Sequence, residues 1–165
     1  MGTVSRCLGI DLGLVGGAGL AVVEEGTPPR VLHTVALPPG QSGSDFLEAV
    51  KSLLWEYASN LVVCERPWTG RRDPRPNVGM AQRERLGLVK LACERHGLPK
   101  SRLRPIWATT MKRMVTGSGR ASKLQVGSIL RGILRIEEED EHVLDALGLC
   151  LAGLQAERVR KAGRR

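Results

Sequence analysis

Two carboxylates stand where an apolar run of the sequence ends. Asp11 follows residues 7–10, and Glu65 follows residues 61–64. Each run has the length and composition of a buried strand. A charge at the end of such a strand is costly unless a metal ion or another cation meets it. If the two strands are parallel neighbours, Asp11 and Glu65 lie side by side. Taken alone, the first stretch could be a hairpin whose acidic residue, Asp11, simply faces solvent.

A histidine and an aspartate occur three residues apart near the end of the chain, at His142 and Asp145. In a helix this spacing places both side chains on one side. Carboxylate oxygens with one imidazole suit Mg²⁺ or Mn²⁺ better than they suit structural zinc. Two such ions about 4 Å apart would stabilise the attacking and leaving oxygens of a phosphodiester displacement. The pair alone is also compatible with an ordinary helix start.

The overall charge indicates what such a site would act on. The chain has 165 residues, a formal net charge of +8 and a pI near 9.9. Its 25 basic residues are nineteen arginines and six lysines. Because the planar guanidinium suits phosphate recognition, this composition favours a polyanion partner, although a solvated basic surface would give the same totals.

The cysteines and the apolar runs indicate the cellular compartment in which the chain is expected. Four widely spaced cysteines lie among apolar residues, with no C-x-x-C pair: Cys7, Cys64, Cys93 and Cys150. We expect them to be buried free thiols in a reducing environment. No apolar run approaches the about 20 residues of a membrane-spanning helix, and no signal peptide is recognisable at the start. The expected location is therefore the cytoplasm.

The first half of the chain predicts an α/β fold that begins with three antiparallel strands. These are the run before Asp11, residues 20–23 and residues 30–37. Ser44 would cap a helix that continues to Tyr57, where apolar residues recur at helical spacing. The run before Glu65 follows this helix. A strand reached through a helix usually pairs parallel to an earlier strand, which favours Glu65 beside Asp11.

The second half predicts further helices separated by basic turns. An exposed basic loop over residues 69–77 precedes a helix over about 80–96. A strand over 103–108 follows, and then a short helix through Val115 that Thr109 or Thr110 would cap. A glycine-serine turn over 117–122 is not a P-loop, because G-x-x-x-x-G-K-[ST] is absent. The next helix has an apolar face of Val126, Ile129, Leu130, Ile133 and Leu134.

The last helix, over residues 142–159, has a stripe of leucines at helical spacing. They are Leu144, Leu147, Leu151 and Leu154. We find no internal repeat and no second domain. The expected organisation is one domain over residues 1–157 and a basic tail over residues 158–165.

Four stretches, in this order, resemble the RuvC-type Holliday junction resolvases. They are I-D-L-G at 10–13, V-V-C-E at 62–65, G-x-G-x-A-x-K-x-Q-V at 117–126 and H-x-x-D-A-L at 142–147. The ordered set is specific and extends over almost the whole chain. The resemblance implies the ribonuclease H-like fold, a five-stranded mixed sheet of three antiparallel strands and then parallel ones, flanked by helices.

The same resemblance implies roles for individual residues. Asp11, Glu65, His142 and Asp145 would be catalytic ligands of two Mg²⁺ ions per active site, with Mn²⁺ as a substitute. Lys123 would also be catalytic, since it and Lys112 match lysines that contact the scissile strand. His142 could bind metal or carry a proton, since the family often has an acidic residue there. The implied DNA-binding residues are Trp68, Arg71, Arg72, Arg75, Lys112, Arg120 and Lys123. Trp68 stands where the family has an aromatic wedge, usually phenylalanine.

The implied activity is the resolution of four-way (Holliday) DNA junctions in recombination and repair. A homodimer joined through the helix over 80–96 would nick two opposing strands symmetrically and leave 5′-phosphate and 3′-hydroxyl ends. A branch-migration helicase is a further partner that the resemblance suggests, and no membrane is expected. The protein would act in a prokaryotic cytoplasm, as a cellular or a viral protein. The arginine-rich loop at 71–77 leaves open the broader branched-DNA selectivity of viral relatives.

Other classes of protein share parts of this pattern. Sugar kinases and actin-like ATPases also begin with an I-D-x-G strand, but they need two such domains. Ribonuclease H-like enzymes of RNA processing have a similar length, yet they lack the 117–126 stretch and the aromatic after the strand-end glutamate. A DNA-binding module without catalysis does not require acidic residues at three separated places. The RNA-processing nuclease is the alternative that remains beside the viral type.

Overall fold

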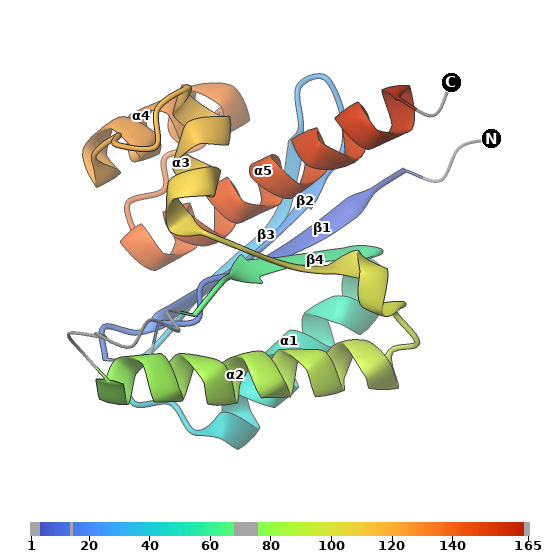
Figure 1. Cartoon of the computed structure of the whole chain (residues 1–165), viewed down its shortest axis with the longest axis vertical. Helices are drawn as coiled ribbons and strands as arrows, with labels where there is room; N and C mark the ends of the chain where they lie inside the picture. The colour runs from blue at the N-terminus through green and yellow to red at the C-terminus, as the bar shows by residue number, and fades with distance from the viewer. Residues whose placement is uncertain (1–3, 14, 68–75, 164–165) are drawn as a thin grey trace.

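A computed structural model describes residues 4–13, 15–67 and 76–163 of the chain. Figure 1 shows one central sheet with helices on both of its faces. In chain order the elements are β1 (Arg6–Ile10), β2 (Ala18–Glu24), β3 (Arg30–Leu37), α1 (Gly43–Tyr57), β4 (Leu61–Glu65), α2 (Pro76–Arg95), the 3₁₀ turn η1 (Lys100–Arg102), β5 (Leu103–Ile106), α3 (Ala108–Thr116), α4 (Lys123–Leu134) and α5 (Glu141–Ala162).

The sheet has five strands in the order β3-β2-β1-β4-β5. β1 pairs antiparallel with β2, and β2 pairs antiparallel with β3. β4 pairs parallel with β1, and β5 pairs parallel with β4. This topology confirms the predicted mixed sheet, in which a meander is followed by parallel strands.

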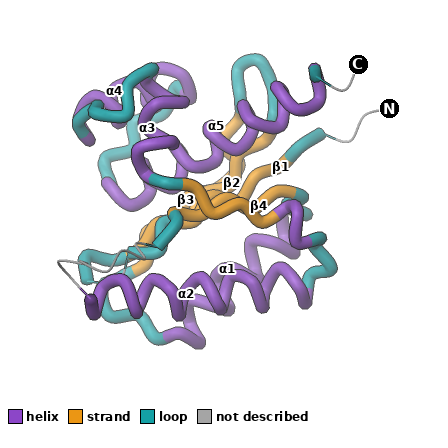
Figure 2. The backbone as a smooth tube through the Cα atoms, in the orientation of Figure 1, coloured by secondary structure: helices purple, strands orange, loops and turns teal. Residues whose placement is uncertain are grey.

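The sheet is buried on both faces. Figure 2 shows α3, α4 and α5 over one face and α1 and α2 over the other. Along β1 the side chains alternate between the two layers: Cys7 belongs to the core beneath α5, while Leu8 and Ile10 belong to the core beneath α1 and α2. Burial on both faces explains why the central strands are continuous apolar runs rather than alternating ones.

The backbone of α5 lies very close to β1 and β2. A Cβ atom on Gly9 would stand 2.0 Å from the backbone oxygen of Ala146, and one on Gly19 would stand 2.0 Å from the backbone oxygen of His142. Neither oxygen can yield as a flexible side chain does. The absence of side chains at Gly9 and Gly19 therefore lets the first turns of α5 rest on the sheet.

Several element ends differ from the sequence expectation. Ser42, rather than Ser44, caps α1 and accepts a hydrogen bond from the Asp45 N–H at 3.1 Å. Trp107, rather than Thr109 or Thr110, is the N-cap of α3, and its side chain makes no capping bond. The first helical position of α2 is a proline, which suits that position because the orphan N–H is missing.

The late helices also differ in extent and in the face they bury. α5 continues to Ala162, so the expected basic tail begins inside the helix. On α4 the buried stripe is Val126, Gly127, Leu130 and Leu134, whereas Ile129 and Ile133 are 36% and 40% exposed. The predicted apolar face was therefore too wide, because α4 packs along one narrow stripe.

A buried carboxylate near the C-terminal end of α5 joins this helix to β5. Glu157 is 2% exposed, and its side chain forms ion pairs with Arg102 of η1, at 3.1 Å, and with Arg104 of β5. Removing one partner of a buried ion pair costs about 3–5 kcal/mol when the remaining charge is fully buried. Both arginines are partly exposed here, so a smaller cost follows.

We expect Glu157→Gln to reduce the free energy of unfolding by about 2 kcal/mol, or roughly 4–8 °C in Tm. Thermal denaturation measures the effect. Glu48→Gln is the matched control, since it makes the same chemical change in an exposed pair with Lys51 on α1 and should cost about 0.5 kcal/mol or less. Equal melting temperatures for the two variants would show that the buried pair adds no stability.

Two further expectations concern the whole chain. All four cysteines are buried and free, as predicted. Within the part of the chain that the structure describes, no helix combines the length and the apolar character needed to cross a bilayer.

Candidate active site

The parallel pairing of β1 and β4 brings two carboxylates together. The register sets Ile10 opposite Cys64, so Asp11 and Glu65 follow at the same end of neighbouring strands. Asp11 is 5% exposed, and its backbone N–H is bonded to the Gly19 carbonyl at 2.9 Å. The sequence prediction that these two carboxylates lie side by side is confirmed.

The start of α5 brings the His/Asp pair to the same place. Asp140 caps the helix, because its carboxylate accepts hydrogen bonds from the His142 and Val143 N–H groups at 2.9 and 3.0 Å. His142 and Asp145 therefore lie in the first turns of α5 and project from one side of the helix. The close approach at Gly19 carries both of them over the end of β1.

His142 contacts Asp11 directly. The His142 Nδ1 lies 2.6 Å from one carboxylate oxygen of Asp11, and the other oxygen accepts a hydrogen bond from the Gly13 N–H at 3.1 Å. The backbone of Gly16 also bonds the imidazole ring. These contacts fix the orientation of the Asp11 carboxylate between α5 and the turn that follows β1.

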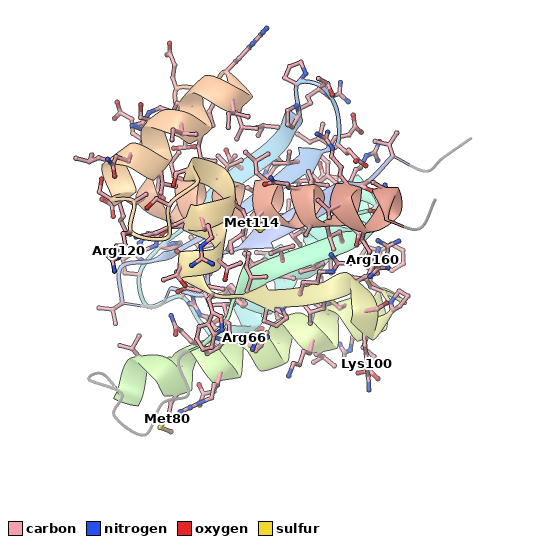
Figure 3. The ribbon with its side chains drawn as sticks, turned by 45° about the horizontal axis from the view of Figure 1, so that its top comes forward. Arg66, Met80, Lys100, Met114, Arg120 and Arg160 are labelled. Carbon is pink, nitrogen blue, oxygen red and sulfur yellow. The ribbon has the colours of Figure 1, made fainter. Side chains whose placement is uncertain are left out.

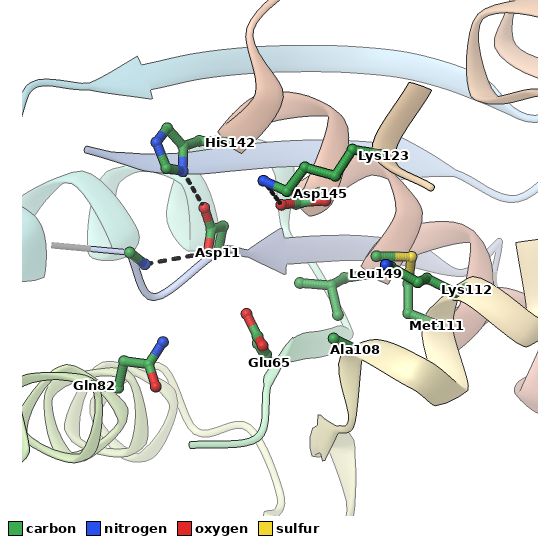
Figure 4. Close-up of a pocket in the computed structure, with 11 residues that line it drawn as sticks. Asp11, Glu65, Gln82, Ala108, Met111, Lys112, Lys123, His142, Asp145 and Leu149 are labelled. Atoms are coloured by element: carbon green, nitrogen blue, oxygen red, sulfur yellow. Dashed lines mark hydrogen bonds and ion pairs between the residues drawn. The ribbon is translucent and has the colours of Figure 1, made fainter. Parts of the chain in front are cut away.

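A cavity of about 380 Å³ gathers these groups (Figure 4). It is lined by Asp11, Gly13, Glu65, Gln82, Ala108, Met111, Lys112, Lys123, His142, Asp145 and Leu149. Lys123 is the first residue of α4, where Ser122 and Gln125 form a capping box. Its Nζ lies 3.1 Å from Glu141 and 3.4 Å from Asp145. Thus all the predicted catalytic residues and Lys112 line one pocket.

Burial and crowding change the protonation of these groups. Burial, followed by the negative charges of Asp11 and Asp145, raises the pKa of Glu65 to about 7. Burial also raises the pKa of Asp11 and of Asp145, although the contacts with His142 and Lys123 act in the opposite direction. For His142, burial lowers the pKa, but the hydrogen bond and charge of Asp11 outweigh it and raise the pKa overall.

The donor set suits a hard divalent cation. Three crowded carboxylates hold negative charge that a cation would offset, and oxygen donors with one imidazole fit Mg²⁺ or Mn²⁺. Among the described residues, no three acidic, histidine or cysteine side chains converge closely enough to hold an ion as they stand. Because one oxygen of Asp11 is bonded to His142, an ion would compete with the imidazole for that oxygen.

Of the other predicted DNA-binding residues, the structure describes Arg120 and leaves four outside the described part of the chain. Arg120 is exposed and projects from the connection between α3 and α4, whereas Arg160 of α5 lies toward the other side of the view (Figure 3). Trp68, Arg71, Arg72 and Arg75 lie outside the described residues. Gln82 of α2 was not predicted from the sequence, and it faces the carboxylates from across the pocket (Figure 4). Only the packing of α2 beneath the strand ends places Gln82 in the lining of the pocket.

Comparison with known proteins decides the family. The family model described as crossover junction endodeoxyribonuclease RuvC matches residues 7–153. The chain belongs to the RuvC family. The RuvC of Halorhodospira halophila is 31% identical over 156 aligned positions, which cover 90% of this chain and 89% of the relative. The RuvC of Thermobifida fusca is 32% identical over 173 aligned positions, covering 95% and 90%.

Solved RuvC structures share the fold. The structure of T. thermophilus RuvC in complex with a Holliday junction substrate superposes with a TM-score of 0.79 at 25% identity, covering 94% of this chain and 96% of that one. The ribonuclease H-like architecture expected from the four sequence stretches is therefore confirmed, and with it the assignment to a family of endodeoxyribonucleases.

Proposed function

We propose that this chain resolves four-way DNA junctions by hydrolysing one phosphodiester in each of two opposing strands. The observation that carries the proposal is the convergence of Asp11, Glu65 and Asp145 with Lys112 and Lys123 in one pocket of a RuvC-family fold. A module that only binds DNA gains nothing from three carboxylates in its pocket, because they repel the phosphates.

Two divalent ions, Mg²⁺ or Mn²⁺, would supply an activated water and stabilise the charge on the leaving oxygen when bound. Asp11, Glu65 and Asp145 are the residues that would hold them. His142 orients Asp11 through its Nδ1 and either turns to become a ligand or carries a proton. Lys123 reaches the mouth of the pocket beside Asp145, where its ammonium would contact the scissile phosphate.

Lys123→Ala tests this contact. If Lys123 binds a phosphate, the slope of log affinity against log salt should flatten by about 0.9, because one fewer counterion is released on binding. If Lys123 acts on the charge that develops during cleavage, the slope stays the same and the rate falls. Salt titrations of junction binding and single-turnover cleavage measure the two quantities. A variant with an unchanged slope and an unchanged rate would remove Lys123 from the site.

The excess of arginine and the position of Trp68 support a branched DNA substrate. Trp68 follows Glu65 by three residues, with Pro67 between them. A proline stiffens the backbone and cannot donate to a sheet. In this proposal the indole stacks on bases at the open centre of a junction, where linear duplex offers no unstacked faces.

Trp68→Ala should reduce junction cleavage by about tenfold or more with little change in Tm, since one stacking contact contributes about 1–3 kcal/mol. Trp68→Phe should keep most of the activity. A tryptophan that instead filled the core would cost about 3–5 kcal/mol on truncation. A large fall in Tm together with normal cleavage per folded molecule would therefore exclude the wedge.

The remaining parts of the proposal concern assembly and products. A homodimer joined through α2 would present two active sites to opposing strands, and a branch-migration helicase would deliver the junction in a prokaryotic cytoplasm.

Paired nicking predicts that a cruciform plasmid is linearised rather than only nicked. The proposed 5′-phosphate and 3′-hydroxyl ends predict that resolved duplexes are sealed by DNA ligase without prior phosphorylation.

A gel assay tests the function as a whole. Four-way junction, Y-fork, linear duplex and structured RNA are incubated with the chain in Mg²⁺ or in EDTA. The expected result is cleavage of the junction, dependent on Mg²⁺, with little cutting of duplex. Equal cutting of the fork would support the broader branched-DNA nuclease, and preferred cutting of RNA would support an RNA-processing enzyme. Junction binding without any cleavage would overturn the assignment of a nuclease.

A further inference from the structure

Arg85 of α2 is a buried arginine that the proposed chemistry does not use. Arg85 is only 3% exposed, although a guanidinium charge is costly to bury. In the described part of the chain its hydrogen bonds go to backbone carbonyls, and its flat face covers an aromatic ring. A buried guanidinium that bonds backbone carbonyls in this way constrains the backbone segments to which those carbonyls belong.

The contacts of Arg85 join three segments. One terminal nitrogen donates to the carbonyl of Gly13, in the turn after β1, and the other donates to the carbonyl of Gln41, just before α1, at 3.3 Å. The guanidinium carbon lies 4.7 Å from the centroid of the Phe46 ring in α1. Because the guanidinium fork is rigid, both carbonyls are held at once.

Gly13 connects Arg85 to the active site. The carbonyl of Gly13 accepts from Arg85, while its N–H donates to the carboxylate of Asp11 at 3.1 Å. The turn is tight, since a Cβ on Gly13 would lie 2.3 Å from the Gly17 carbonyl. The charge of Asp11 also acts to raise the pKa of Arg85, although burial lowers that pKa overall.

We propose that Arg85 is a positioning residue, which fixes the Gly13 turn and through it the orientation of the Asp11 carboxylate during cleavage. This inference rests on the proposed role of Asp11. It links α2, the helix expected at the dimer interface, to the active site through one side chain. Arg85 itself does not touch the DNA in this assignment.

Arg85→Met removes the donors and keeps most of the side-chain length, and Arg85→Lys keeps the charge but reaches only one carbonyl. Val89→Ala is the matched control, because Val89 is fully buried on the same helix but has no polar side-chain group that could bond the turn. For Arg85→Met we expect single-turnover cleavage of a four-way junction to fall by about 10²-fold, since a small misplacement of a reacting group costs that much. Junction affinity in EDTA should stay within about threefold.

Two further measurements separate positioning from a general loss of stability. The ¹H–¹⁵N NMR signal of the Gly13 amide should shift in Arg85→Met and not in Val89→Ala, and Mn²⁺ binding followed by electron paramagnetic resonance should weaken only in the arginine variants. Arg85→Lys should recover part of the rate. Val89→Ala should lower Tm and retain the rate per folded molecule.

The inference would be overturned if Arg85→Met cleaved within about threefold of the unchanged chain, or if Val89→Ala lost as much rate as Arg85→Met. Asp11→Asn is measured in parallel. If Asp11→Asn abolishes cleavage and Arg85→Met does not affect it, only the role of Arg85 fails. If Asp11→Asn cleaves normally, the proposed site itself fails.

Discussion

Asp11→Asn is expected to reduce junction cleavage by about 10²-fold or more, because a carboxylate that holds metal ions positions the charge that develops in the transition state. Junction affinity should survive or rise, since one negative charge near the phosphates is lost. The variant should fold normally. Burial already raises the pKa of Asp11, so a neutral side chain is not penalised there, and the amide oxygen can still accept from the Gly13 N–H.

Single-turnover cleavage, gel-shift affinity and thermal denaturation of Asp11→Asn form one data set. Glu48→Gln is the control, because it removes one negative charge from the surface of α1, outside the residues that line the pocket. It should cleave as the unchanged chain does. Cleavage by Asp11→Asn within about tenfold of that rate in saturating Mg²⁺ would contradict the metal-ligand role.

Gly19→Ala should also disable cleavage, for a steric reason. The added methyl group would stand 2.0 Å from the backbone oxygen of His142 and 2.5 Å from the N–H nitrogen of Val143, so the first turn of α5 must move. A displacement near 1 Å costs about 10²-fold in rate. Forcing an extra group into a packed interior also costs about 1–3 kcal/mol of stability.

Gly132→Ala is the control for Gly19→Ala, because a Cβ atom at this position of α4 meets nothing within 4 Å apart from its chain neighbours and the backbone of its own helix. Alanine in an open helical position should stabilise the chain by about 0.5–1 kcal/mol and leave cleavage unchanged. Single-turnover rates corrected for the folded fraction compare the variants. A normal corrected rate for Gly19→Ala would show that the placement of α5 tolerates this shift.

The strand ends of the active site were predictable because each depends on a local pattern and one topological rule. The apolar runs before Asp11 and Glu65 identify buried strands, and the intervening helix favours a parallel pairing. The i, i+3 spacing of His142 and Asp145 fixes their common side in the same way. These features need no knowledge of how the layers pack.

The contacts that depend on packing between layers were not predictable. A glycine inside a strand gives no sign of which helix lies over it, so the role of Gly19 appears only when α5 is in place. Gln82 and Arg85 are two polar residues of α2 with no distinguishing local pattern, and only the packing of α2 decides that one faces the pocket and the other meets Gly13. The bond between His142 and Asp11 likewise depends on where α5 crosses β1.

Because α5 is long, the Glu157 ion pairs at one end of the helix affect the position of the residues at its other end. The helix has His142 in its first turn and Glu157 roughly 22 Å further along, at 1.5 Å per residue. A rigid rod of that length that pivots by about 3° at the Glu157 end moves its other end by about 1 Å. The ion pairs with Arg102 and Arg104 therefore hold the end of α5 that lies far from the pocket. Substitutions in β5 or η1 that break these pairs can thus shift His142 and slow cleavage, although the substituted residues do not line the pocket.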